Sequence, residues 1–130
     1  MDLPLPMFLH FMFMAVALMC FCTAFFIVRK KRDSKWMKRH RFAATSGVIS
    51  AIAGFIAMFI NKLISSYPHF TSIHAIAGLT ALIIISTAFI LGNLILKGKK
   101  VRPVHKFSGR AGIIIIIITA LLGVMMLVLS

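Results

Sequence analysis

Four long runs of apolar residues constrain this chain more than any other feature. They cover residues 3–28, 42–60, 73–96 and 111–129, and a helix needs roughly 20 mainly apolar residues to cross a bilayer. A soluble domain is about half apolar, whereas 61% of these 130 residues are hydrophobic. The strands of a membrane barrel are shorter and alternate in hydropathy, which these runs do not. The sequence therefore predicts an all-α membrane protein, a four-helix transmembrane bundle.

A single domain over residues 1–130 accounts for all four runs, with helices expected at about 4–28, 37–61, 72–96 and 104–128. The first run is long for a cleaved signal peptide, which has a basic start and an apolar core of about 7–15 residues. This chain starts instead with Met1 and the acidic Asp2. We therefore expect the first run to be a helix of the mature protein.

The net charge of +13 comes from basic residues gathered in two of the three links between the runs. The first link has Arg29, Lys30, Lys31, Arg32, Lys35, Lys38, Arg39 and Arg41. In or beside the third link lie Lys97, Lys99, Lys100, Arg102, Lys106 and Arg110. The second link has only Lys62. Since Lys and Arg are retained on the cytoplasmic side of spanning helices, we expect links one and three to be cytoplasmic and both termini to be non-cytoplasmic. The charge thus marks topology, and no nucleic-acid partner is expected.

Each expected helix has one histidine near its N-terminal end, namely His10, His40, His74 and His105. An ionisable side chain inside a membrane is costly and marks a functional site by default, although hydrogen bonding near the interface is the simpler alternative for each one. Successive helices alternate in direction, so His10 and His74 fall in the outer leaflet and the other two in the inner leaflet. Neutral imidazoles are good iron ligands. Two pairs at opposite depths therefore predict two haem b groups with these four histidines as axial ligands.

Small residues one turn from the histidines are consistent with a flat cofactor. Gly78 follows His74 by four residues and Gly109 follows His105 by four, so each glycine shares the face of its histidine. A porphyrin lying against a helix needs such space. Small residues also allow transmembrane helices to pack closely, and that alternative remains open here.

Other chemistries lack the residues that they need. A zinc or di-iron site gathers its ligands at one depth, usually with carboxylates, and proton-coupled transport uses an acidic residue inside the membrane. The only acidic residues are Asp2 and Asp33, and both lie outside the four runs. No carboxylate–His–Ser arrangement for hydrolysis is present either.

Three segments resemble the cytochrome b561 family. Residues 68–78 are similar to its H-F-x-S-x-H-x-x-x-G signature, and residues 102–110 to its R-P-x-H-x-x-x-G-R stretch. Residues 36–41 resemble the W-x-x-x-H-R stretch that opens the second core helix, and His10 takes the place of the first core histidine. The resemblance extends over nearly the whole chain.

The resemblance implies a transmembrane oxidoreductase core with two haems b. Such a core passes electrons from a cytoplasmic donor, often ascorbate, to an extracytoplasmic acceptor such as monodehydroascorbate or a ferric chelate. Its ligand pairing, first histidine with third and second with fourth, agrees with the pairing that helix direction gives. Many members have six helices, and the Trp that often follows the third histidine is replaced here by Ala75-Ile76. The donor and the acceptor are therefore left open.

Candidate substrate contacts follow from the same comparison and from charge. His69 and Phe70 resemble family residues near the acceptor site, although a solvated loop position is the alternative for His69. Lys99, Lys100 and Arg102 are candidates to steer an anionic donor or to stabilise haem propionates. Headgroup anchoring is the simpler role for most basic residues.

Two other functions remain open on the sequence. The chain is either a haem-bearing anchor subunit of a larger redox complex or a haem-free four-helix accessory protein, if it is not a transmembrane oxidoreductase. The expected partners are the lipid bilayer and either a small anionic donor such as ascorbate or a redox partner protein, with a homodimer as a further expectation. The expected location is the plasma membrane or another cellular membrane.

Overall fold

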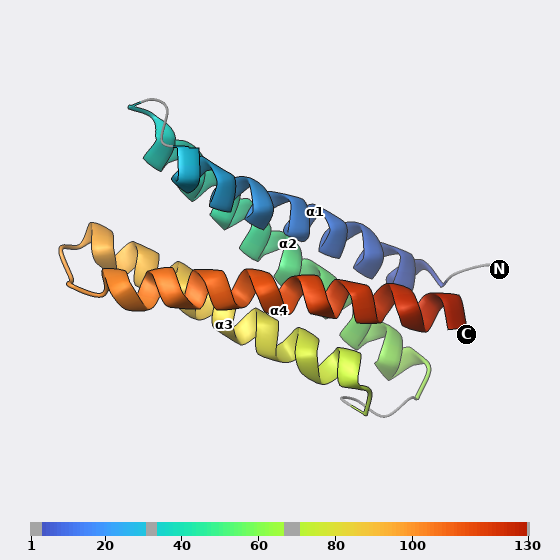
Figure 1. Cartoon of the computed structure of the whole chain (residues 1–130). Helices are drawn as coiled ribbons and strands as arrows, with labels where there is room; N and C mark the ends of the chain where they lie inside the picture. Colours follow the sequence, from blue (N-terminus) through green and yellow to red (C-terminus); the bar gives the residue numbers. More distant parts are fainter. Residues whose placement is uncertain (1–3, 31–33, 67–70, 130) are drawn as a thin grey trace. The chain divides into compact units, whose positions relative to one another are not determined.

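The computed structural model describes residues 4–30, 34–66 and 71–129, and it contains four helices and no strand within these ranges (Figure 1). The helices are α1 (Leu5–Lys30), α2 (Trp36–Ile64), α3 (Ile73–Leu96) and α4 (Arg102–Leu129). Each is long and apolar enough to cross a membrane. The predicted all-α membrane fold with four spanning helices is confirmed.

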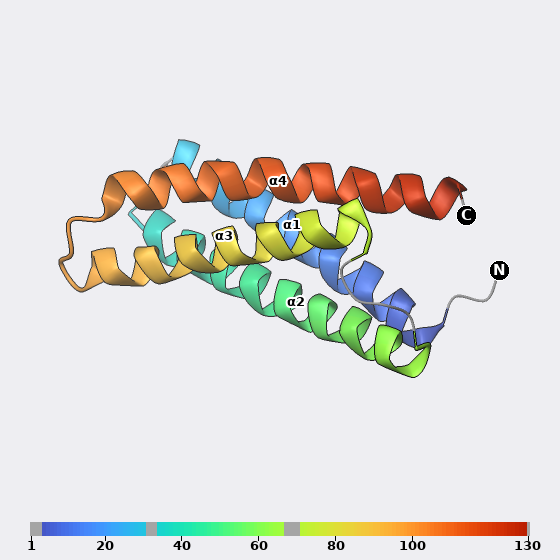
Figure 2. The same cartoon turned by 90° about the horizontal axis from the view of Figure 1, so that it is seen from below.

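The chain divides into two compact units, Met1–His69 and Phe70–Ser130. In the first unit α1 packs along α2, and in the second α3 packs along α4, so each unit is an antiparallel helical hairpin (Figures 1 and 2). We call them the first and the second hairpin and describe each by itself.

Local sequence signals set the ends of the helices in the second hairpin. Ser72 has extended backbone angles, and its hydroxyl accepts a hydrogen bond from the backbone N–H of Ala75, which is an N-cap that starts α3. At the other end, Gly98 has a φ of 79°, and the N–H of Lys99 donates to the carbonyl of Leu94. This is a Schellman ending, in which a left-handed residue is required and glycine has no steric penalty. Pro103 then lies in the first turn of α4, where its missing N–H costs no helical bond.

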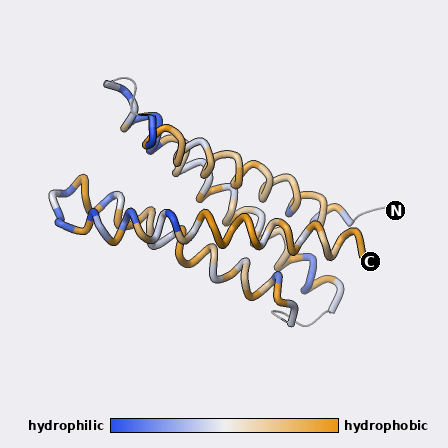
Figure 3. The backbone as a smooth tube through the Cα atoms, viewed as in Figure 1, coloured by the Kyte–Doolittle hydropathy of each residue, from blue (hydrophilic) through white to orange (hydrophobic). Residues whose placement is uncertain are grey.

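Hydropathy divides each hairpin into an apolar middle and polar ends. Figure 3 shows apolar residues along most of every helix and hydrophilic residues near the α1–α2 link and at the α3–α4 turn. The turn joining α3 to α4 is short, because Lys97 caps α3 and α4 begins at Arg102. The basic residues of each hairpin are therefore concentrated where its two helices are joined.

Small residues allow the two helices of each hairpin to approach closely. A Cβ added to Gly47 on α2 would lie 2.7 Å from the Phe21 ring of α1, and a Cβ added to Gly112 on α4 would lie 2.7 Å from Ile85 of α3. Both distances are too short for real carbon contacts, so only glycine fits without a shift. Close packing of spanning helices on small residues is common in membranes.

The two hairpins repeat one packing pattern at a nearly constant offset. The buried residues of α1 are Ala17, Phe21 and Ala24. Those of α3 are Ala81, Ile85 and Ala88, with the same spacing and 64 residues further along the chain. The glycines Gly47 and Gly112 occupy equivalent places, 65 residues apart. The second hairpin is therefore a structural repeat of the first, with one extra residue between its helices.

Gly47→Ala is expected to destabilise the first hairpin. Phe21 is only 6% exposed, so its ring has little room to move, and forcing a methyl group into such a site costs about 1–3 kcal/mol. The measurement is thermal unfolding in detergent followed by circular dichroism. The double variant Gly47→Ala/Phe21→Ala should lose less stability than the sum of its single changes. Strict additivity would show that the close approach does not determine stability.

Candidate functional site

Four half-buried histidines lie close to the starts of the four helices. His10 is in the second turn of α1, His40 in the second turn of α2, and His74 and His105 in the first turns of α3 and α4. Each ring is directed at the neighbouring helix of its own hairpin, where it meets the backbone. The four histidines that the sequence singled out thus share one kind of environment.

In the first hairpin, two hydrogen bonds connect the histidines to backbone carbonyls. His10 Nδ1 donates to the carbonyl of Gly54 on α2, at 2.9 Å. His40 Nδ1 donates to the carbonyl of Ala24 on α1, at 3.0 Å. Each helix therefore supplies one histidine and one acceptor.

The second hairpin repeats this arrangement. His74 Nδ1 donates to the carbonyl of Thr119 on α4, at 3.0 Å, and His105 Nδ1 to the carbonyl of Ala88 on α3, at 2.8 Å. A histidine and its acceptor are 44 or 16 residues apart in the first hairpin and 45 or 17 in the second. The hydrogen bonds thus occupy equivalent positions of the repeat.

These bonds determine which ring nitrogen suits a metal. A carbonyl oxygen can only accept, so Nδ1 of each ring must be protonated. In a neutral imidazole the lone pair is then on Nε2, which is the ligand form of a histidine whose other nitrogen donates to a carbonyl. The donor set therefore fits an axial imidazole ligand of haem iron at all four positions.

The two histidines of one hairpin lie at different levels. Ala24, which accepts the bond from His40, follows His10 by 14 residues on α1, and a helix of that length rises about 21 Å. Ala88 follows His74 by the same 14 residues on α3, so His105 is about 21 Å from His74 along that hairpin. Two nitrogens that bind opposite faces of one iron must lie only a few ångströms apart, so one hairpin cannot supply both ligands of one iron.

Of the two glycines predicted to flank a porphyrin, one faces its own hairpin and the other faces open space. A Cβ on Gly78 would lie 3.6 Å from the methyl group of Thr119, which is an ordinary contact. A Cβ on Gly109 would have no heavy atom within 4 Å.

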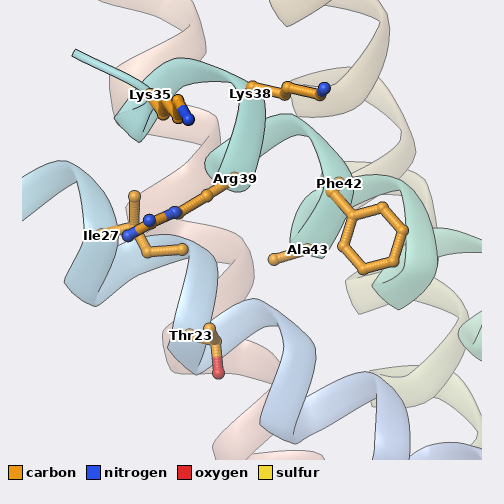
Figure 4. Close-up of a pocket in the computed structure, with 7 residues that line it drawn as sticks. All are labelled: Thr23, Ile27, Lys35, Lys38, Arg39, Phe42 and Ala43. Atoms are coloured by element: carbon orange, nitrogen blue, oxygen red, sulfur yellow. The ribbon is translucent and has the colours of Figure 1, made fainter. Parts of the chain in front are cut away.

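A pocket of about 410 Å³ in the first hairpin lies beside the start of α2 (Figure 4). Three basic side chains, Lys35, Lys38 and Arg39, form part of its lining, together with Thr23, Ile27, Phe42 and Ala43. Arg39 extends from α2 toward Ile27 on α1 (Figure 4). Basic groups beside an apolar floor suit a small organic anion. Two of the lining residues, Arg39 and Thr23, directly precede His40 and its acceptor Ala24 in the sequence.

Comparison with known families settles the class of the protein. The family described as eukaryotic cytochrome b561 matches residues 4–129, nearly the whole chain. The chain belongs to the cytochrome b561 family. The resemblance seen in the sequence is thereby confirmed, and with it the assignment to haem b-containing membrane proteins of transmembrane electron transfer. No curated protein and no solved structure matches the chain.

The remaining predicted site residues of this cytochrome b561 are less informative. Lys99, Lys100 and Arg102 are exposed at the α3–α4 turn, while His69 and Phe70 lie outside the described residues. Within the part of the chain that the structure describes, no three His, Cys, Asp or Glu side chains are grouped to hold a metal ion.

Sequence reasoning missed the acceptor carbonyls and the pocket of this cytochrome. A backbone carbonyl has no residue signature, so Gly54 and Thr119 were not identified as partners of histidines. The internal repeat was the available signal, since residues 64 or 65 apart have the same environment in both hairpins. The pocket takes side chains from two helices, which composition alone does not bring together.

Side-chain ¹⁵N NMR of the haem-free cytochrome tests the hydrogen bonds. At mildly alkaline pH, four histidines are expected as Nδ1–H tautomers, because a carbonyl accepts from each Nδ1. Single His→Gln variants assign the signals, and His69→Gln removes the fifth ring. An Nε2–H tautomer at any of the four would contradict the assignment at that position.

Proposed function

We propose that this cytochrome b561 transfers electrons across the membrane through two b-type haems, from a cytoplasmic donor to an extracytoplasmic acceptor. The observation that carries the proposal is the set of four Nδ1–carbonyl hydrogen bonds, which prepare Nε2 as the ligand atom at two levels of each hairpin. When bound, a haem b takes up and releases one electron at its iron. The two hairpins act together as one domain.

The two levels support a specific pairing of ligands. Because the histidines of one hairpin are about 21 Å apart along it, each iron takes one histidine from each hairpin. Consecutive spanning helices alternate in direction, so α1 and α3 start on the same side of the membrane. His10 therefore pairs with His74, and His40 pairs with His105.

The protein supplies orientation and electronic tuning to these sites. A hydrogen bond from Nδ1 fixes the plane of the imidazole and makes Nε2 a stronger donor to the metal. Gly78 and Gly109, one turn after His74 and His105, are proposed to lie beside the porphyrin faces. The open surroundings of Gly109 support this role more strongly than the contact of Gly78 with Thr119.

The basic residues support a direction for the transfer. Since Lys and Arg are concentrated in links one and three, these links are proposed to be cytoplasmic. The pocket at Lys35, Lys38 and Arg39 is a candidate site for an anionic donor such as ascorbate. Lys99, Lys100 and Arg102 are the corresponding candidates in the second hairpin. His69 and Phe70 are proposed to contact an acceptor such as monodehydroascorbate or a ferric chelate.

An anchor subunit is the second candidate function. The exposed basic residues of the α3–α4 turn would equally suit an acidic surface of a soluble redox partner. In that case the haems would be reduced by the partner and not by a small molecule. A homodimer is compatible with either function.

Substitution of single histidines tests the pairing. His40→Ala and His105→Ala should each remove the same haem, and His10→Ala and His74→Ala the other, because an iron that loses one axial imidazole is held weakly. The measurement is the reduced-minus-oxidised spectrum with a redox titration that resolves the two haems. If the wild-type protein showed no α-band change, the haem proposal would be wrong. If His40→Ala behaved like His74→Ala, the pairing would be wrong.

Neutralising the pocket should weaken the donor reaction. Lys35→Gln/Lys38→Gln is expected to lower the rate of haem reduction at limiting ascorbate by about tenfold, because clustered charges raise the encounter rate of an anion. Stopped-flow reduction at low ionic strength measures this rate, and added salt should reduce the difference between variant and wild type. Lys62→Gln, at the other end of α2, is the matched control and should react like wild type. Reduction by dithionite but not by ascorbate in the wild type would favour the anchor function.

A further inference from the structure

Each of the four histidine rings that the structure describes lies beside the same feature of the neighbouring helix. In an α-helix the carbonyl of residue i accepts from the N–H of residue i+4, so each histidine shares its acceptor with that N–H. The side chain at i+4 therefore stands next to the imidazole. In the first hairpin these residues are Met58, four after Gly54, and Val28, four after Ala24. In the second hairpin both are glycines, Gly123 and Gly92.

The glycines leave space that the rings occupy. A Cβ on Gly123 would lie 2.8 Å from Cε1, 3.2 Å from Nδ1 and 3.6 Å from Nε2 of His74. A Cβ on Gly92 would lie 3.2 Å from Cε1 and 3.5 Å from Nδ1 of His105. A methyl group at Gly123 thus requires the ring to move, and one at Gly92 requires a shift of a few tenths of an ångström.

These approaches differ from the helix-packing glycines. The atoms nearest to a Cβ on Gly47 belong to Phe21, and those nearest to a Cβ on Gly112 belong to Ile84 and Ile85. At Gly92 the two atoms within 4 Å, and at Gly123 the three nearest atoms, all belong to the imidazole. Close packing of α3 on α4 therefore does not by itself require these two glycines, whereas the position of each ring does.

We propose that Gly92 and Gly123 are positioning residues that set the imidazole planes of His105 and His74. This inference rests on the proposed role of the two histidines as haem ligands. A ring seated against bare backbone is limited on its Cε1 side by the helix itself, and its Nδ1 bond further restricts its rotation. In the second hairpin both imidazoles thus lie against a glycine, whereas the corresponding positions of the first hairpin are Val28 and Met58.

The arrangement predicts which haem each substitution affects. Gly123→Ala should perturb only the outer haem, through His74, and Gly92→Ala only the inner haem, through His105. The effect of Gly123→Ala should be larger, because its closest distance of 2.8 Å is shorter than the 3.2 Å at Gly92. Loss of an outer-shell partner typically weakens metal binding about 10- to 100-fold, and we expect a loss of this size in haem affinity for Gly123→Ala.

Three measurements on the full-length protein test the proposal. Side-chain ¹⁵N NMR of the haem-free protein should show a changed His74 signal in Gly123→Ala and a changed His105 signal in Gly92→Ala. Electron paramagnetic resonance of the oxidised protein reports the angle between the two axial imidazole planes, and one low-spin signal should shift in each variant. A redox titration should show one shifted potential and one unchanged potential.

Gly112→Ala is the matched control. It introduces a similar close approach, 2.7 Å to Ile85, on the same helix as Gly123 but away from a histidine. It should lower stability while both low-spin signals and all histidine signals stay as in wild type.

The outcomes separate this proposal from the proposed function. If the wild type holds two haems but Gly92→Ala and Gly123→Ala leave the histidine NMR, the low-spin signals and the potentials unchanged, the glycines do not position the rings. The same conclusion follows if Gly112→Ala produces the same spectral changes. If the wild type binds no haem while the variants still shift the histidine NMR signals, the two glycines do position the rings and the proposed haem function is wrong.

Discussion

The need to satisfy a polar imidazole inside an apolar medium determines much of this structure. A ring N–H without a partner is expensive in lipid, and most acceptors along a spanning helix are carbonyls already bonded within it. A small side chain on the accepting residue leaves room for a second donor at such a carbonyl. Three of the four acceptors are accordingly Gly54, Ala24 and Ala88, and the fourth is Thr119. The small residues of each hairpin therefore serve both close helix packing and the seating of the rings.

Both hairpins supply carbonyl acceptors to their histidines, and in both the two histidines are separated by the same length of helix. In both hairpins the acceptor on the first helix follows the histidine of that helix by 14 residues, so that two levels arise at the same separation. Each copy of the hairpin pattern thus presents one histidine at each of its two levels. The repeat would thereby supply the two pairs of ligands that the proposed function requires.

The sequence predicted the features that depend on one helix at a time. Lengths of apolar runs gave the four helices, and the alternation of helix direction gave the two levels of histidines. The predicted helix ends are less accurate. The helix α2 continues to Ile64, beyond the expected residue 61, because the polar residues Asn61 and Lys62 remain helical. The missed features join two helices. The sequence points to Gly78 and Gly109, which lie on the histidine's own helix, whereas the glycines that touch the rings, Gly92 and Gly123, lie on the facing helix. Which residues of two helices face each other depends on how the helices align along the hairpin, and the apolar pattern of one helix alone does not specify this alignment.

The basic residues have a second consequence beyond topology. Lys35, Lys38 and Arg39 precede His40 by one to five residues, so the cations proposed to mark the cytoplasmic link also lie beside a candidate electron entry point. The N-terminus of α2 adds the positive end of its helix dipole at the same place. An anion attracted there meets an apolar floor formed by Ile27, Phe42 and Ala43, and this floor favours a small organic anion over a strongly hydrated inorganic one. Charge placement that orients the chain in the bilayer would then also select the donor, which ties the direction of electron transfer to the direction of insertion.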